Sequence, residues 1–228
     1  MESRELDVAI IDYRMCNLFS VQSACNYNSL YSEITHDKDR ILAADAAILP
    51  GVGSFSEAME YLNSSGLIQV INEFIKSGKP FMGICLGMQL LLSEGEEFGI
   101  NKGLDIIPGY VKKFPQRNKN EKIIKVPHIG WNKIEIAEGK SDNDWYIPPL
   151  NEINSGEFMY FLHSFYAIPN DKEVVVTTTN YEDVDFCSSL MYNNVFACQF
   201  HPERSGREGL KIIKNFADTI KHNKGDVN

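Results

Sequence analysis

Apolar runs of strand length alternate with helix-like segments through the first half of the chain. The runs cover residues 7–12, 31–35, 46–49 and the stretch that ends at Cys85. Between them, apolar residues recur every three or four positions in residues 17–28, in residues 55–62 and in a segment that ends at Lys76. Near-continuous apolar strands separated by amphipathic helices are typical of a parallel sheet that is covered on both faces.

The second half has a different pattern, in which apolar and polar residues alternate. The alternation runs through residues 157–166, 173–179 and 186–200 and predicts antiparallel hairpins. A last helix is expected from about Gly206, because one of its faces is apolar; that face carries Leu210, Ile213, Phe216, Ala217 and Ile220. Residues 115–120 and 138–156 are polar, contain Gly or Pro, and are predicted loops.

These elements predict one α/β domain spanning residues 1–228, since the chain has no internal repeat and its length suits one large domain. The expected fold is a mostly parallel sheet with flanking helices and an antiparallel C-terminal hairpin region. In such a sheet, functional groups gather at the carboxyl ends of the strands. Cys85 and the expected turn at residues 50–53 both lie at such ends.

Cys85 is the first candidate for chemistry. It sits in the sequence Gly83-Ile-Cys-Leu-Gly87, where an apolar run ends and a helix is expected to begin. Glycines on both sides relieve crowding around a nucleophile on a strained strand-to-helix turn, and the helix start favours the thiolate. A buried structural thiol is the alternative, but such a thiol needs no small residue on either side.

The segment Gln199-Phe-His201-Pro-Glu203 supplies a matching base and acid. His201 and Glu203 are two residues apart, so on an extended backbone both side chains point to the same side. The alternative is a surface turn followed by a solvated glutamate. Together with the Cys85 turn, however, the segment predicts a nucleophile, a base and an orienting carboxylate: Cys85, His201 and Glu203.

The turn Pro50-Gly-Val-Gly53 offers backbone N–H groups for an oxyanion hole, which needs donors from two segments. Leu86 N–H would supply one donor, and Gly51, Val52 or Gly53 the other. After this turn, Ser54 is expected to cap a helix, with Glu57 completing a capping box.

For three other segments, the residues alone do not decide between a functional and a structural role. Gln89 lies one helical turn after Cys85 and would either bind a substrate amide or carboxylate, or be a polar residue on a partly exposed turn. His163, within an expected strand, is most simply a core histidine with satisfied hydrogen bonds. Residues 126–132 form either a binding loop or a buried corner, and composition does not decide between them.

Composition narrows the class of protein further. The formal charge of −9 argues against nucleic acid or an anionic membrane as the main partner. The sequence has no leader-like start and no apolar stretch of membrane-spanning length, so a cytoplasmic protein is expected. Five cysteines without a C-x-x-C pair make disulfides and tetrahedral zinc unexpected; Cys16, Cys25, Cys187 and Cys198 are predicted to be buried thiols.

Taken together, the motifs resemble those of the triad-type (class I) glutamine amidotransferase family. Within it, the chain is most similar to the glutaminase subunits of imidazole glycerol phosphate synthase, from histidine biosynthesis. The resemblance covers nearly the whole chain, and the motifs arrive in family order. They are Asp12-Tyr13 with Asn17, Pro50-Gly-Val-Gly53, residues 83–91, Val126-Pro-His-Ile-Gly-Trp-Asn132, His163-Ser-Phe165, Gln199-Phe-His-Pro-Glu203 and Ser205-Gly206.

The resemblance implies an open Rossmann-like sheet and hydrolysis of L-glutamine to glutamate and ammonia. Cys85 would form a glutamyl thioester, His201 would move the protons, and Glu203 would orient the imidazole. Leu86 and residues 51–53 would form the oxyanion hole. The substrate-binding residues would be Gln89, His163, Ser164 and Phe165. The family needs no cofactor or metal, and it delivers the ammonia to a (β/α)8-barrel synthase subunit that docks over the site as a heterodimer and stimulates it.

The chain departs from the family at three places. Arg14-Met15-Cys16 replaces a glycine-rich loop, residues 138–156 are longer and more polar, and Arg204 stands where lysine is common. Arg204 is expected to face the partner. The departures leave open a duplicated glutaminase that supplies ammonia for sugar amidation in surface-polysaccharide synthesis. A stand-alone cysteine amidohydrolase is a second alternative. The presence of Cys85, His201 and Glu203 argues against a third, a non-catalytic relative.

Overall fold

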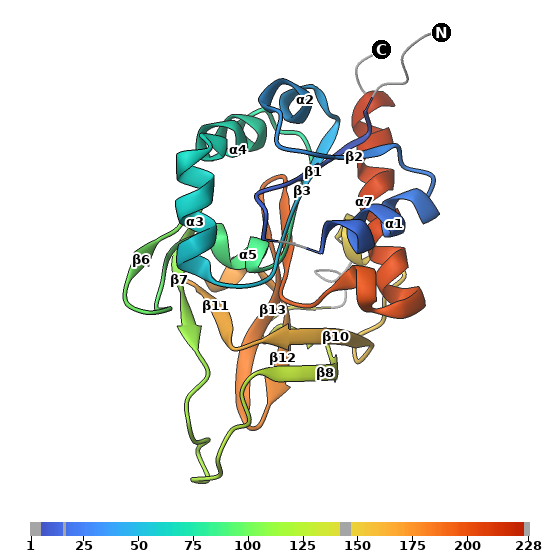
Figure 1. Ribbon diagram of the computed structural model, residues 1–228. Helices are drawn as coiled ribbons and strands as arrows, with labels where there is room; N and C mark the ends of the chain where they lie inside the picture. The colour runs from blue at the N-terminus through green and yellow to red at the C-terminus, as the bar shows by residue number, and fades with distance from the viewer. Residues whose placement is uncertain (1–5, 16, 142–146, 226–228) are drawn as a thin grey trace, which may run out of the picture.

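An eight-stranded sheet forms the centre of the computed structural model, which describes residues 6–15, 17–141 and 147–225, with side chains through residue 220 (Figure 1). The strand order is β2-β1-β3-β4-β14-β13-β12-β9. The first five strands pair in parallel and the remaining pairs are antiparallel, so the predicted fold class is confirmed. In sheet order, the strands are Ser32–Thr35, Val8–Ile11, Ala46–Gly51, Phe81–Cys85, Val195–Cys198, Val184–Tyr192, Val175–Tyr181 and Glu135–Ile136.

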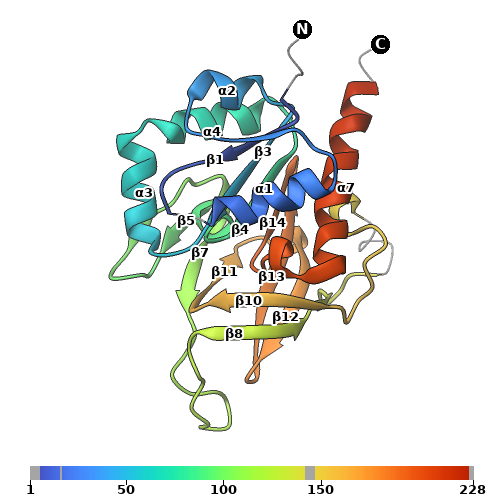
Figure 2. The ribbon, with the colours of Figure 1, turned by 45° about the vertical axis from the view of Figure 1, so that its right-hand side comes forward.

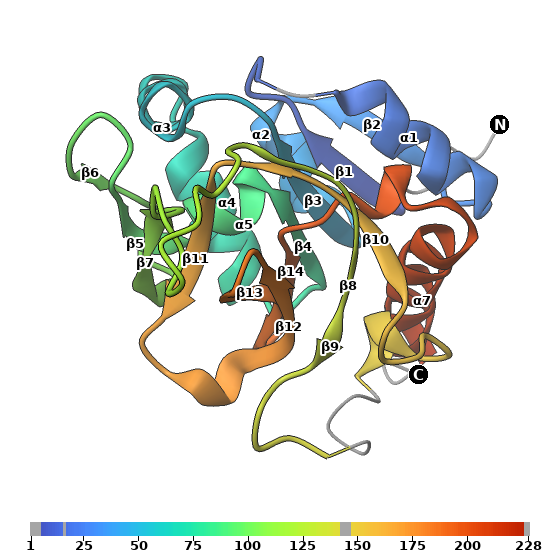
Figure 3. The ribbon, with the colours of Figure 1, turned by 90° about the horizontal axis from the view of Figure 1, so that it is seen from below.

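Helices cover both faces of the parallel strands (Figure 3). Helices α1 (Leu18–Tyr27) and α7 (Gly206–Gly225) lie on one face. Helices α2 (Lys38–Ala43), α3 (Phe55–Ser64) and α4 (Leu67–Lys76) lie on the other. Successive residues of β1 enter different cores: Val8 and Ile10 pack with α1 and α7, whereas Ala9 and Ile11 pack with the other helices. Burial on both faces explains why these strands are continuously apolar. None of the described helices is both long and apolar enough to cross a membrane.

Two smaller sheets complete the architecture (Figure 2). One pairs β8 (His128–Lys133) with β10 (Phe158–His163), so most of the segment at residues 126–132 is a strand. The other contains β11 (Phe165–Pro169), β7 (Ile107–Lys113), β5 (Leu92–Gly95) and β6 (Asn101–Lys102). Short 3-10 helices lie at Pro148–Leu150 (η1), Lys172–Val174 (η2) and Pro202–Arg204 (η3).

Three local expectations were wrong in detail. Pro50 and Gly51 belong to β3, because Gly51 still pairs with Cys85 across the sheet, and the turn begins only at Val52. The side chain of Ser54 does not cap α3; the carboxylate of Glu97 accepts the N–H of Phe55 instead. The third difference concerns β14, which was expected only in a hairpin. It also pairs in parallel with β4, and this pairing brings the segment that follows Cys198 next to Cys85.

The glycines around Cys85 let the short helix α5 (Leu86–Leu90) lie directly against the sheet. A Cβ atom on Gly87 would lie 1.8 Å from the carbonyl oxygen of Leu49 in β3. A Cβ on Gly83 would lie 2.9 Å from Leu91 Cδ1. The two positions therefore require glycine for close packing between the helix and the strands, in addition to any relief of crowding around the nucleophile.

Gly87→Ala should destabilise the protein severely, because the added methyl group would overlap a backbone oxygen that cannot move without breaking the sheet. We expect the free energy of unfolding to fall by about 3 kcal/mol or more. Gly78→Ala is the matched control: its Cβ would meet nothing within 4 Å, and only the positive φ of +80° opposes it. Its cost should be about 1–2 kcal/mol. The free energy of unfolding of both variants is measured by chemical denaturation. Equal losses of this free energy in the two variants would contradict the packing argument.

Candidate active site

Cys85 occupies the junction between β4 and α5, with φ +54° and ψ −108°. A non-glycine residue in this region stores about 1–3 kcal/mol of backbone strain, and such strain persists only where the surrounding structure enforces it. Here the strand pairing on one side and the packing of α5 on the other enforce it. The result is a thiol placed at the carboxyl end of a central strand, with the residue only 4% exposed.

His201 and Glu203 follow β14, on the strand next to β4. Nδ1 of His201 donates to Oε1 of Glu203 at 2.8 Å, and the two side chains are 4% and 3% exposed. The backbone N–H of His201 donates to Tyr160 O at 2.9 Å, and the Ser205 hydroxyl donates to His201 O at 2.6 Å. These bonds hold the histidine in one orientation, with Nδ1 protonated and Nε2 left to face the reaction.

The electrostatic environment strongly favours the protonated form of His201. Burial of the ring lowers its pKa, but the negative charges of a Cys85 thiolate and of Glu203 outweigh burial and raise the pKa of His201 to about 10. Within the described part of the chain, Nε2 has no partner in hydrogen-bonding geometry. Cys85 thus acts on the ring mainly through its charge, and Nε2 is open to receive the thiol proton.

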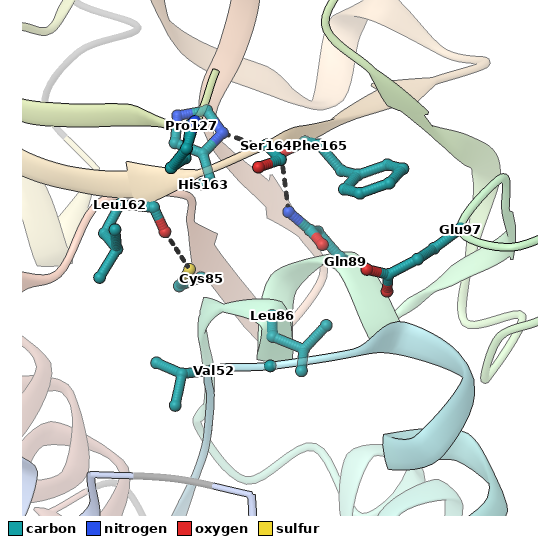
Figure 4. Close-up of a pocket in the computed structure, with 11 residues that line it drawn as sticks. Val52, Cys85, Leu86, Gln89, Glu97, Pro127, Leu162, His163, Ser164 and Phe165 are labelled. Carbon is teal, nitrogen blue, oxygen red and sulfur yellow. Dashed lines mark hydrogen bonds between the residues drawn. The ribbon is translucent and has the colours of Figure 1, made fainter.

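The sulfur of Cys85 has two polar neighbours. Its S–H group points at Leu162 O, 3.7 Å away (Figure 4). Nε2 of Gln199 donates to the sulfur at 3.5 Å. Gln199 is fully buried. The neutral thiol therefore has an acceptor in the Leu162 carbonyl. After the thiol loses its proton, the sulfur would still accept a hydrogen bond from Gln199.

A cavity of about 280 Å³ opens beside the thiol. It is large enough for a small amino acid. Most residues expected in the oxyanion hole or substrate site line it; the full set is Val52, Gly53, Cys85, Leu86, Gln89, Glu97, Pro127, Leu162, His163, Ser164 and Phe165. Gly51 is the exception: it is buried beneath Tyr13, whose hydroxyl would lie 2.1 Å from a Cβ at this position.

The backbone of Val52 does not point its N–H at the cavity. This N–H donates instead to Met15 O at 3.0 Å. The peptide between Gly51 and Val52 must therefore turn before it can bind an oxyanion beside Cys85. The following glycine already has a φ of +107°, a conformation that suits a mobile turn.

Gln89 has a defined orientation in the cavity. Its Nε2 donates to Phe165 O and to Gln199 Oε1, both at 2.9 Å, which uses both amide hydrogens. Its Oε1 therefore remains as an acceptor and suits a donor on the ligand, such as an ammonium group. The residue is buried, so the alternative of a partly exposed polar residue is wrong.

The ring of His163 is committed to hydrogen bonds inside the protein. Nδ1 donates to Phe165 O at 2.8 Å, so in the neutral ring Nε2 accepts from Nδ1 of His128 at 3.0 Å. Nε2 of His128 then accepts the side-chain amide of Asn132 at 3.4 Å. His163 can therefore contact a ligand only through its ring face or its backbone.

Several groups in the site were not assigned a role from the sequence. Gln199 was part of a quoted motif, and its only signal was a polar residue within an otherwise apolar strand end. Glu97, Pro127 and Leu162 reach the cavity from loops and strands far apart in the chain, and no local pattern marks them. His128 lies in a quoted motif but received no function of its own.

The remaining described cysteines differ from Cys85. Cys25, Cys187 and Cys198 are buried, as predicted. Burial raises the pKa of the Cys25 thiol to about 12 and raises the pKa values of Cys187 and Cys198 as well. Cys16 lies outside the described residues. Selective reaction at Cys85 is therefore favoured over these three thiols.

A partly exposed group of aromatic and basic residues lies close to His201, whose ring centroid is 6.5 Å from that of Tyr160. The guanidinium of Arg204 lies 5.9 Å from the ring centroid of Tyr160. Tyr160 in turn meets Trp131 edge-on, with centroids 6.1 Å apart. Trp131 is 54% exposed, although it is a large aromatic residue. Arg204 is exposed as well, so its charged group is associated with this aromatic pair at the surface.

Known proteins resemble the chain over nearly its full length. The family model described as class-I glutamine amidotransferase matches residues 10–220. Imidazole glycerol phosphate synthase subunit HisH from Syntrophotalea carbinolica is 43% identical over 212 residues, which are 92% of this chain and 99% of that protein. The HisH subunit from Moorella thermoacetica is 43% identical over 215 residues, or 94% of this chain and 96% of that protein.

Solved structures share the fold at much lower identity. A glutamine amidotransferase from Thermotoga maritima has a TM-score of 0.59 at 18% identity and covers 99% of this chain and 87% of that one. PurLQS from the same organism has a TM-score of 0.67 at 19% identity, with 94% of this chain and 99% of that chain covered.

His201 should stay protonated through neutral pH in an NMR titration of the purified protein and should lose its proton near pH 10. Glu203→Gln removes one of the two negative charges that raise this pKa, so the midpoint should fall. Cys25→Ala, which removes a buried thiol that is not among the groups shifting the pKa of His201, should leave the midpoint unchanged. A wild-type midpoint below pH 7 would show that burial, and not the neighbouring charges, dominates at His201.

The histidine pair should make the fold sensitive to mild acid. Burial lowers the pKa of His128 to about 4 and that of His163 to about 3. In the unfolded chain each value returns to about 6.5, so below this pH the unfolded state binds more protons and the free energy of unfolding falls. Urea unfolding between pH 6.5 and 5 should show a shallower pH dependence in His163→Gln than in the wild type. Parallel pH profiles would count against this account.

Proposed function

Because the chain belongs to the class-I glutamine amidotransferase family, we propose that it is the glutaminase subunit of an imidazole glycerol phosphate synthase in histidine biosynthesis. It would hydrolyse L-glutamine to glutamate and ammonia and pass the ammonia to a (β/α)8-barrel synthase subunit. The observation that carries the proposal is the 43% identity, over almost the entire length, to subunits with this name. The arrangement of Cys85, His201 and Glu203 supports it with a mechanism.

The first half of the reaction forms a thioester. With its proton held on Nε2 of His201, the Cys85 thiolate attacks the carboxamide carbon of glutamine. The resulting oxyanion needs donors, which Leu86 N–H and a reoriented Val52 N–H would supply. His201 then protonates the departing nitrogen, and ammonia leaves. Glu203 holds the ring so that Nε2, and not Nδ1, faces the thiol throughout.

The second half returns the enzyme to its starting state. His201, now neutral, takes a proton from water, and the hydroxide attacks the thioester carbon. Glutamate leaves, and the sulfur regains a proton or remains a thiolate beside the imidazolium. Gln89 Oε1 would accept from the α-ammonium group of glutamine, while backbone groups of His163, Ser164 and Phe165 would line the other side.

The bond between Val52 N–H and Met15 O supports low activity in the isolated chain. In this arrangement the oxyanion hole lacks one of its two proposed donors. Removal of one such donor typically costs a factor of about 100–1,000 in rate. A partner that turns this peptide would therefore stimulate hydrolysis without moving the thiol or the histidine.

The group of Trp131, Tyr160 and Arg204, in which Trp131 and Arg204 are exposed, is the proposed partner surface. Large aromatic residues and arginine are enriched at protein interfaces, and this group lies next to the catalytic segment. Docking there would place the barrel subunit over the site. Each step of the proposed reaction uses side-chain and backbone groups of this chain, glutamine and water.

Glutamate release from L-glutamine by the purified chain, with and without the barrel synthase partner and its ligand, tests the proposal. We expect weak activity alone and stimulation of about tenfold or more with the partner. Stimulation only by a sugar-amidating synthase would favour the surface-polysaccharide alternative. Full activity without any partner would favour a stand-alone amidohydrolase.

Three variants test the roles of single residues in the same assay. Cys85→Ser should abolish partner-stimulated hydrolysis, whereas Cys25→Ala, at a buried cysteine away from the cavity, should retain it. Arg204→Ala should reduce the stimulation by the partner more than the basal rate, because the guanidinium lies over Tyr160 and not at the thiol. Unchanged stimulation in Arg204→Ala would remove this residue from the partner surface.

A further inference from the structure

We propose that Gln199 is a positioning residue of this site, whose side-chain amide stabilises the Cys85 thiolate and fixes the orientation of Gln89. The inference deepens the proposed function and rests on it for the identity of the substrate. Its structural basis is a short chain of hydrogen bonds that runs from Phe165 O through Gln89 and Gln199 to the sulfur.

Strand register places Gln199 beside the nucleophile. Cys198, the last residue of β14, pairs with Ile84 in β4, so the next residues of the two strands are Gln199 and Cys85. Gln199 is held there by its backbone N–H, which donates to Ser188 O at 2.9 Å. Its position is therefore set by the sheet and not by a flexible loop.

The hydrogen bonds determine which way the amide of Gln199 faces. Nε2 of Gln89 uses its two hydrogens on Phe165 O and on Oε1 of Gln199, so Oε1 of Gln199 must face Gln89. Nε2 of Gln199 then points at the sulfur, 3.5 Å away. The opposite orientation would set two NH2 groups against each other and leave an oxygen against the sulfur.

This donor matters most when Cys85 is ionised. The thiol form donates to Leu162 O. Once its proton is on His201, the negatively charged sulfur is repelled by the partial negative charge of that carbonyl oxygen. A hydrogen bond to the charged form favours it. Gln199 supplies such a bond from a fully buried position where water does not compete. Its removal should disfavour the thiolate.

The same amide connects the nucleophile to substrate binding. By accepting from Gln89, Gln199 keeps Oε1 of Gln89 turned toward the cavity, where a donor on the ligand would meet it. Loss of Gln199 should thus affect both thiol reactivity and the KM for glutamine. Loss of Gln89 should raise KM, because it removes the acceptor that faces the ligand.

The test is the pH dependence of Cys85 alkylation by iodoacetamide in the purified full-length chain. Mass spectrometry of the peptide that contains Cys85 separates it from the other cysteines. Gln199→Met keeps a similar shape but removes the amide. We expect the pH of half-maximal alkylation to rise by about one unit relative to the wild type, so that the rate at a fixed pH below both midpoints falls about tenfold.

A control variant separates positioning from a general loss of stability. Asn215→Leu removes another buried amide, which donates to Asn151 O at 2.5 Å at a site that involves neither η3 nor the cavity. It should lower Tm without changing the alkylation profile. If Gln199→Met does not fold, Gln199→Asn, which shortens the amide by one methylene, repeats the measurement.

A profile of Gln199→Met that superimposes on the wild type would overturn the proposal, and so would an equal shift in Asn215→Leu. The readout needs no substrate, so it remains decisive if the chain proves not to hydrolyse glutamine. In that case the proposed function fails in the glutamate assay, while the alkylation profile still decides whether Gln199 acts on Cys85.

Discussion

The direct contact of α5 with β3 and β4 is the constraint on which the rest of the site depends. Gly87 lies so close to the Leu49 carbonyl that the first turn of the helix is pressed onto the strands. Cys85 must then leave its strand with a positive φ, and this conformation presents the thiol at the carboxyl end of the central strand β4. Without this contact the nucleophile would lack a fixed position relative to His201, which arrives from β14 on the neighbouring strand.

The polar groups around Cys85 are buried, and burial makes unmet hydrogen bonds expensive. Gln89, Gln199, His163 and His128 therefore form continuous chains in which each donor has an acceptor. Among the catalytic groups, Nε2 of His201 and Oε2 of Glu203 are exceptions within the described residues. An open nitrogen on the base is what proton transfer from the thiol requires.

Local patterns in the sequence were sufficient for most strands of the central sheet, most helices, the family and the segments that carry Cys85, His201 and Glu203. They did not predict the strands β5, β6, β7, β8 and β9. They failed where a contact joins distant segments. Residue 54 looked like a helix cap, but Glu97, more than forty positions later, accepts the Phe55 N–H. The alternation through residues 186–200 indicated a hairpin, yet β14 also pairs in parallel with β4. For the same reason no motif indicated the direction of the Gln199 amide, which depends on Gln89 and Phe165.

The site combines rigid and adjustable parts, and this difference suits control by a partner. The thiol, the histidine and the carboxylate are fixed by strand pairing, close packing and buried hydrogen bonds, so changing their positions would disturb both cores. The N–H of Val52 is directed away from the cavity by a backbone hydrogen bond to Met15 O. The net contribution of such a bond is about 1 kcal/mol, which a few contacts from a docked protein can offset. In the proposed mechanism, control of hydrolysis would therefore need only a local turn of the backbone, while Cys85, His201 and Glu203 remain in place.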